Sequence, residues 1–206
     1  MVPILYEDKD IIVVHKPAGL ESQSSRGFAP DMVSEISCYL HNPQDIHKPA
    51  AGISRVQPPY VGVIHRLDKP VQGVMVYAKN QKSAAALSAA LQAGKMEKSY
   101  MAVICGQLVD KQGSYVDYLR QDRKNNTSEI VDKSVKDAKK AVLKYREMEV
   151  IHSPEDKEQM VSLIDIELLT GRHHQIRVQF AGHGTPLYGD GRYGGDISTI
   201  VDIKKK

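Results

Sequence analysis

The residues best suited to chemistry lie together in one short segment. His65, Arg66 and Asp68 fall directly after an apolar pair and directly before an alternating apolar run. Pro70 and Gly73 bracket a turn, because proline fixes φ and glycine accepts backbone angles that other residues avoid. A polar loop between two strand-like segments is a common place for reacting groups. We therefore take Asp68 as the leading candidate for a catalytic carboxylate.

Each candidate residue could also have a purely structural role, and each residue taken singly favours that structural interpretation. Asp68 next to Arg66 could form a surface ion pair or cap a turn, and Tyr100 at the head of a strand could be a core aromatic. Arg172 and Arg177 could complement acidic neighbours. The first turn of a helix carries partial positive charge, however, so placing cations there has a small electrostatic cost. That cost favours the interpretation that Arg172 and Arg177 face an anion.

Several other chemistries lack the required spacing. His65, His173 and His174 have no nearby Cys, Glu or third histidine at helical ligand spacing, so we expect no metal. The glycines between residues 182 and 194 match neither a phosphate-binding loop nor a dinucleotide fingerprint. No serine lies in a nucleophile-elbow pattern.

Composition and charge describe an ordinary globular protein. The 206 residues are 41% hydrophobic and 26% charged, which suits one large domain or two small lobes. A net charge of +3 is compatible with a polyanionic partner without requiring one. Two cysteines make no disulfide framework, and the acidic N-terminal segment and short apolar runs suit neither a signal peptide nor a membrane span. We expect a cytoplasmic monomer that does not bind membranes.

Periodicity predicts the elements that must position these residues. A buried strand at 11–14 ends in a turn, and Asp31 is placed to cap a helix reaching Leu40. A further strand at 74–78 leads into a helix that Asn80 caps. The remaining expected elements are a loop at 42–59, the end of that second helix at Gly94, strands at 100–104, 141–150 and 164–168, a polar loop or hairpin at 121–140, and a helix that Thr170 caps. This order predicts an α+β fold with a mixed, largely antiparallel β-sheet and flanking helices, in a single domain spanning residues 1–206 with a short C-terminal tail at 195–206.

Four motifs follow one another along the chain. They are residues 5–20, His65-Arg66-Leu67-Asp68 with Gly73, Lys98–Ala102 with Gly106, and Thr170–Val178 with the glycine-rich turn at 184–194. Together they resemble the RluA-type pseudouridine synthase family over nearly the whole chain. The resemblance implies the pseudouridine synthase catalytic fold and the isomerisation of uridine in RNA to pseudouridine, with no metal or organic cofactor.

By position, the resemblance also implies the role of each residue. Asp68 becomes the catalytic nucleophile, Tyr100 the active-site tyrosine, and Arg177 the arginine that pairs with Asp68. Arg66 is placed to displace the target base from the stack, which costs a few kcal/mol. The other candidates for RNA contacts are Lys16, Lys98, Arg172, His65, His174 and the basic stretch 120–124.

Two departures from the family pattern bear on these expectations. Val71-Gln72 stand where the family usually has Thr-Ser, so a hydroxyl hydrogen bond near Asp68 is missing or replaced. The sequence also runs from Gly195 to Lys206 without the Leu-His-Ala-like strand that normally follows. The leading hypothesis is a stand-alone synthase acting on ribosomal or transfer RNA, through a covalent or another intermediate. The alternatives are a non-catalytic or impaired RNA-binding member and, more remotely, a nucleoside hydrolase.

Overall fold

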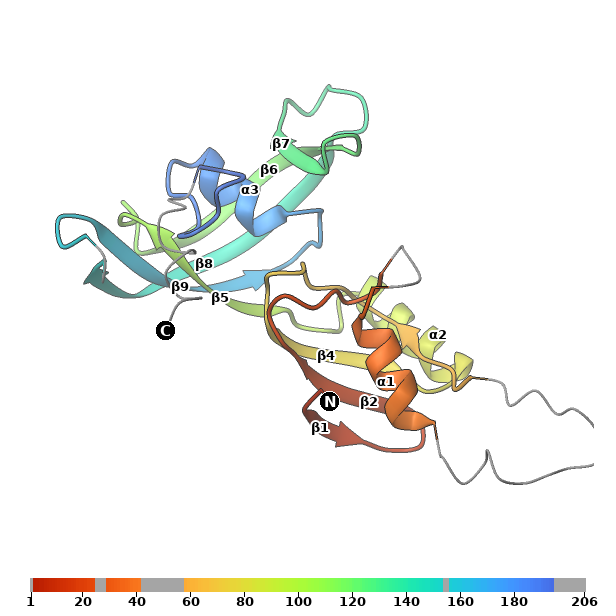
Figure 1. Cartoon of the computed structure of the whole chain (residues 1–206). Coiled ribbons are helices and arrows are strands. Elements are labelled where there is room, and N and C mark those ends of the chain that lie inside the picture. Colours follow the sequence, from red (N-terminus) through yellow and green to blue (C-terminus); the bar gives the residue numbers. More distant parts are fainter. Residues whose placement is uncertain (1, 25–28, 42–57, 154–155, 195–206) are drawn as a thin grey trace, which may run out of the picture. The chain divides into compact units, whose positions relative to one another are not determined.

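The structure is a computed structural model that describes residues 2–24, 29–41, 58–153 and 156–194. Most of the expected loop at 42–59 and the tail at 195–206 lie outside these residues. The chain divides into two compact units, Met1–Met96 and Glu97–Lys206. We call them the N-terminal and C-terminal units and describe each by itself (Figure 1). The prediction that residues 1–206 form one catalytic domain stays a prediction.

The N-terminal unit is built on a four-stranded antiparallel sheet. Its strands, in the order in which they pair, are β1 (Ile4–Glu7), β2 (Ile11–Lys16), β4 (Gly73–Ala78) and β3 (Gly62–Val63). Alternate residues of β2 are buried, and Ile12 and Val14 lie opposite Tyr77 and Met75 of β4. This row of side chains forms the inner face of the sheet, because successive residues of a strand point to opposite faces.

Two helices complete the described part of this unit, and both begin as their sequences predict. Asp31 caps α1 (Met32–Leu40) by accepting the backbone N–H of Ser34 in a capping box. The buried Met32 and Ile36 of α1 join the core formed by the inner face of the sheet. Asn80 caps α2 (Gln81–Gln92). The helix ends just before Gly94, which has a left-handed backbone conformation (φ 68°).

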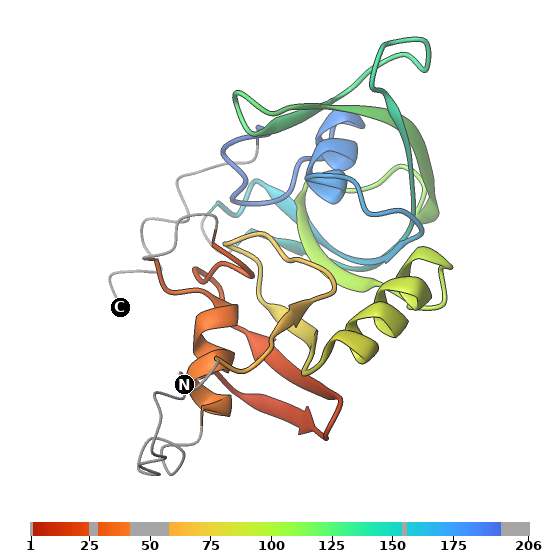
Figure 2. The ribbon, with the colours of Figure 1, turned by 90° about the vertical axis from the view of Figure 1, so that its right-hand side faces the viewer.

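The C-terminal unit contains a five-stranded antiparallel sheet. Its strands pair in the order β5 (Ser99–Cys105), β9 (Met160–Leu168), β8 (Lys139–His152), β6 (Gln112–Asp122) and β7 (Thr127–Ile130). Figure 2 shows this sheet curving around α3 (Gln175–Gly182). Phe180 of α3 is fully buried against Ile104, Leu143 and Ile166 of the sheet. The buried side of α3 thus combines the apolar Val178 and Phe180 with the two glutamines Gln175 and Gln179.

The expected α+β class with a largely antiparallel sheet is confirmed, and one local expectation needs changing. The helix expected to begin at Thr170 begins at Gln175, because Thr170 uses its hydroxyl to join the backbone of Val142 to the side chain of Gln175. The expectation of a loop or hairpin at 121–140 is confirmed in its hairpin form, because the end of β6 pairs antiparallel with β7, and the region also includes the start of β8.

Among the described residues, no helix is long and apolar enough to cross a membrane.

Candidate active site

Asp68 lies on a loop of residues 64–72 between β3 and β4, which we call the Asp68 loop. Its carbonyl accepts the backbone N–H of Val71 at 3.0 Å, which closes the turn predicted from Lys69-Pro70. The loop enters β4 at Gly73, where φ is 156° and an added Cβ would lie 3.2 Å from the side chain of Leu67. Glycine is thus needed at this position for both its backbone angle and its close contact.

Lys16 lies at the end of β2 on the inner face of the sheet, and its side chain is 0% exposed. Its Nζ donates to the carbonyls of Pro17, Leu20 and Lys69 at 3.0, 2.6 and 3.2 Å. Burial lowers the pKa of the Lys16 ammonium, and the negative charge of Asp68 acts in the opposite direction. The ammonium therefore ties the end of β2 to the residue that follows Asp68.

This geometry corrects the assignment of Lys16 to phosphate contacts. A lysine ammonium has three donors, and here all three point to backbone carbonyls inside the protein. A buried ammonium with its donors used in this way cannot also reach an RNA phosphate. Its alternation with Ile12 and Val14 along β2 is the sequence signal that places Lys16 on the buried face.

His65 and Arg66 precede Asp68 in the loop and have different surroundings. The half-buried His65 accepts the backbone N–H of Val76 on its Nε2 at 3.3 Å, so this nitrogen carries no proton. The ring therefore joins the start of the loop to β4. Arg66, in contrast, is exposed.

Tyr100 is the second residue of β5 and lies opposite Ile166 of β9. It is half-buried and packs against the core of the C-terminal unit. The ordinary interpretation of Tyr100 as an aromatic at the rim of a core therefore fits this packing, and its catalytic role stays a prediction.

Arg177 of α3 forms a bidentate ion pair with Asp190. Its Nε donates to Oδ2 at 2.6 Å and its Nη2 donates to Oδ1 at 2.7 Å, and the two side chains are 18% and 8% exposed. Burial alone would raise the pKa of Asp190, but the hydrogen bonds and charge of Arg177 hold it below its usual range. The sequence also allows an acidic neighbour to complement Arg177, and Asp190 is that neighbour.

The ring of Tyr193 lies against the guanidinium of this ion pair. The guanidinium of Arg177 lies 4.9 Å from the ring centroid of Tyr193, a cation–π distance. The Tyr193 hydroxyl accepts the backbone N–H of Ser128 and lies 2.7 Å from Nδ1 of His174, which has a left-handed backbone (φ 53°). We call Arg177, Asp190, Tyr193 and His174 the Arg177 cluster. Asp68 belongs to the other unit, so its expected pairing with Arg177 stays a prediction.

The remaining basic candidates lie just before α3 and at the start of β5. Arg172 is exposed, and its Nε donates to the carbonyl of Lys140 at 2.8 Å. Lys98 is half-buried, and burial together with the positive charge of Arg172 lowers the pKa of its ammonium. Two like charges close enough to affect one another attract an anion more strongly than either charge alone.

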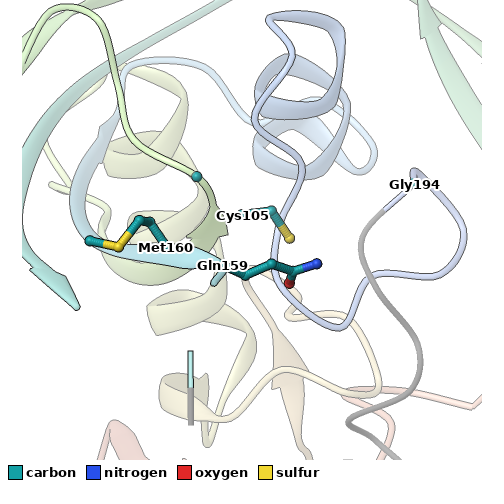
Figure 3. Close-up of a pocket in the computed structure, with 5 residues that line it drawn as sticks. Cys105, Gln159, Met160 and Gly194 are labelled. Atoms are coloured by element: carbon teal, nitrogen blue, oxygen red, sulfur yellow. The ribbon is translucent and has the colours of Figure 1, made fainter. Parts of the chain in front are cut away.

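No group of three His, Cys, Asp or Glu side chains that could hold a metal ion occurs among the residues that the structure describes. The C-terminal unit has an open hollow of about 510 Å³ that is lined by Cys105, Gly106, Gln159, Met160 and Gly194 (Figure 3). None of the predicted catalytic residues lines it.

Comparison with known proteins agrees with this fold. The model of the family described as RNA pseudouridylate synthase matches residues 10–182. An uncharacterized RNA pseudouridine synthase of Aquifex aeolicus is 34% identical, over 97% of this chain and 58% of that protein. The ribosomal large subunit pseudouridine synthase D of Xanthomonas campestris is 33% identical, over 94% of this chain and 52% of that protein. The solved structure of human RNA pseudouridylate synthase domain containing 1 has a TM-score of 0.73 at 20% identity, over 94% of this chain and 70% of its own.

The human structure shows that the fold is that of pseudouridylate synthase domains. The family match covers most of the chain, and the chain belongs to the RNA pseudouridylate synthase family. The resemblance inferred from the motifs is therefore confirmed. The chain spans little more than half the length of the two bacterial relatives.

Proposed function

We propose that the protein converts specific uridines in structured ribosomal or transfer RNA to pseudouridine, with Asp68 as the catalytic nucleophile. The observation that carries this proposal is the position of Asp68 on a hydrogen-bonded turn. The chain that holds this turn belongs to the RNA pseudouridylate synthase family. Ribosomal RNA is favoured by the name of the Xanthomonas campestris relative, a ribosomal large subunit pseudouridine synthase.

The proposed reaction is an isomerisation, so it needs neither an oxidant nor a second substrate. The bond from C1′ to N1 breaks, a bond from C1′ to C5 forms, and the hydrogen at C5 leaves as a proton while N1 gains one. An ionised carboxylate can attack or stabilise an electron-poor sugar carbon, as carboxylates do in glycosidases. Asp68 takes this role, whether the intermediate is covalent or not.

Tyr100 and Arg177 are proposed to act on the same nucleotide. The Tyr100 ring would stack on the detached uracil and prevent its escape, and its hydroxyl would move a proton at C2′ or C5. Arg177 would pair with Asp68 and keep it ionised in a partly dry site, since an opposite charge favours the charged form. A guanidinium has five N–H donors, so binding Asp190 through two of them is compatible with this second role.

RNA recognition is proposed to rest on exposed cations and on base displacement. Arg66 is exposed and lies two residues before Asp68, a suitable place for a side chain that replaces the extruded base in the stack. Lys98 and Arg172 would contact phosphates, which gives an affinity that falls with salt. His65 and His174 would support these contacts from the Asp68 loop and the Arg177 cluster.

A tritium-release assay tests the proposal directly. Unmodified transcripts of large-subunit ribosomal RNA and of transfer RNAs are made with [5-³H]uridine, and tritium reaches water only when C5 loses its hydrogen. We expect release by the wild-type chain and a loss on the order of 10⁴-fold in Asp68→Asn, with nearly unchanged RNA affinity. Equal activity in the variant would contradict the nucleophile role. RNA binding without any release by the wild-type chain would favour the alternative, a non-catalytic or impaired RNA-binding member.

A further inference from the structure

Ser22 contacts the residue that immediately precedes Asp68, although 45 positions separate the two in the sequence. Its Oγ donates to the carbonyl of Leu67 at 2.7 Å and accepts the backbone N–H of Leu67 at 3.0 Å. A hydroxyl has one donor and two acceptor sites, so one side chain can satisfy both backbone groups of Leu67. A single serine thus fixes the peptide groups on both sides of the Leu67 Cα.

Ser22 is itself held rigidly from β4. It is 4% exposed, and its carbonyl accepts the hydroxyl of Tyr77 at 3.1 Å. Burial raises the pKa of Tyr77, so the phenol keeps its proton and remains a donor. The Oγ also lies 3.5 Å from the sulfur of Met75, but its one hydrogen goes to the stronger acceptor, the carbonyl of Leu67. The hydroxyl position is therefore set by the sheet.

The residue that follows Asp68 is anchored from the same segment. The carbonyl of Lys69 accepts the backbone N–H of Gly19 at 2.8 Å as well as the ammonium of Lys16 at 3.2 Å. Asp68 consequently sits between two residues whose backbone is tied to residues 16–22. Anchoring on both sides limits where the carboxylate can lie.

We propose that Ser22 is a positioning residue that holds the Asp68 carboxylate in its reactive place, an inference that rests on the proposed role of Asp68 as nucleophile. Its hydroxyl supplies a hydrogen bond to the loop, where Val71-Gln72 offer no hydroxyl of their own. Catalysis is sensitive to such bracing, because a displacement of about 1 Å can cost on the order of 10²-fold in rate. Substrate affinity, in contrast, depends little on the exact position of one carboxylate.

The test compares Ser22→Ala with Ser162→Ala in the full chain. Ser162 is a matched control, because it is 0% exposed and its Oγ also donates to a backbone carbonyl, that of Gly106, at 2.7 Å. The readouts are the single-turnover rate of tritium release from a transcript that the wild-type chain modifies, KM, kcat and the free energy of unfolding. We expect Ser22→Ala to lose roughly 10- to 100-fold in kcat with little change in KM. We expect Ser162→Ala to keep the wild-type kcat.

Equal kcat in the two alanine variants would overturn the positioning role. If Ser22→Ala does not fold, Ser22→Cys decides, because a thiol preserves the size of the side chain but is a weak donor and acceptor. A wild-type kcat in folded Ser22→Cys would also overturn the inference. Asp68→Asn in the same assay separates the two proposals. If Asp68→Asn is inactive while Ser22→Ala is fully active, only the positioning role fails, whereas an active Asp68→Asn removes the nucleophile role itself.

Discussion

The Asp68 loop and the Arg177 cluster fix their candidate catalytic side chains by different means. In the loop, backbone groups on both sides of Asp68 are bound by a serine hydroxyl, a backbone N–H and one buried ammonium. In the cluster, a guanidinium and a carboxylate hold each other through two short hydrogen bonds. Backbone anchoring fixes the position of a side chain without using its charge. An ion pair fixes orientation and charge together, so removing either partner leaves the other charge buried.

The largest stability effect is expected from breaking the ion pair. Asp190→Asn keeps the shape of the side chain but leaves the guanidinium of Arg177, which is 18% exposed, without its counter-charge. Breaking a buried pair in this way costs roughly 3–5 kcal/mol. Urea unfolding measures the loss in free energy of unfolding. Amide hydrogen exchange then shows whether this loss is confined to the C-terminal unit.

Asp165→Asn is the matched control for Asp190→Asn. Asp165 and Arg146 are 38% and 60% exposed and lie 3.4 Å apart, so solvent screens their attraction. Such surface pairs contribute about 0–1 kcal/mol. If both variants lose the same free energy, burial does not distinguish the Arg177 cluster from an ordinary surface pair.

The ion pair also predicts a pH dependence. Because the folded pKa of Asp190 lies below its usual range, the carboxylate contributes stability above its unfolded pKa of about 3.9. That contribution is lost as the pH falls through the lower folded value. The difference in unfolding free energy between wild type and Asp190→Asn should thus be constant from about pH 5 to pH 7 and shrink below about pH 4. A difference that stays constant into the acid range would contradict this account.

Arg177→Lys separates charge from geometry and should have the next largest effect. Lysine keeps the positive charge but lacks the planar fork that makes two parallel hydrogen bonds. We expect a loss of roughly 10²-fold in the single-turnover rate, because an ammonium cannot fix the orientation of a carboxylate as the guanidinium does. The expected loss of stability is smaller than for Asp190→Asn, since a counter-charge remains. Near-wild-type turnover would mean that the bidentate geometry is not needed.

Local signals in the sequence predict the parts of the fold that depend on local chemistry. The caps Asp31 and Asn80 and the turn after Asp68 follow from residue types within a few positions of one another. Thr170 has the right residue type for a cap, but its hydroxyl is used by β8 and Gln175. A tertiary contact thus overrides a local preference.

Contacts between distant segments explain what the sequence does not predict. Nothing near Ser22 indicates that its hydroxyl meets Leu67, because that contact exists only once the loop has folded back on the sheet. The charge of Lys16 suggested a phosphate ligand, although its place in the alternating pattern of β2 indicated burial. Asp190 was visible only as part of a glycine-aspartate turn, and its pairing with Arg177 requires the turn to face α3.

The smallest effect on stability is expected at Asp31 of the N-terminal unit. It tests whether neutral donors alone hold a buried carboxylate there, without a positively charged partner. Asp31 is 7% exposed, and its two carboxylate oxygens accept backbone N–H groups from Ser34 and Ser24. Asparagine remains a good helix cap, so Asp31→Asn keeps an acceptor for the backbone N–H of Ser34 and loses the acceptor for the backbone N–H of Ser24. We expect a cost of about 1 kcal/mol, and about 2 kcal/mol for Asp31→Ala, which loses both.

The comparison between Asp31→Asn and Asp190→Asn is the informative one, because the same chemical change is made in two buried carboxylates. Both side chains are less than 10% exposed, and both have a pKa below the usual range. They differ in one kind of partner, because the donors to Asp31 are neutral N–H and O–H groups, whereas Asp190 binds a guanidinium in addition to the backbone N–H of Arg192. Urea unfolding at pH 7 should therefore separate the two variants by roughly 2 kcal/mol or more. Equal costs would mean that the charge of Arg177 contributes no more to holding Asp190 than a pair of neutral donors contributes to holding Asp31.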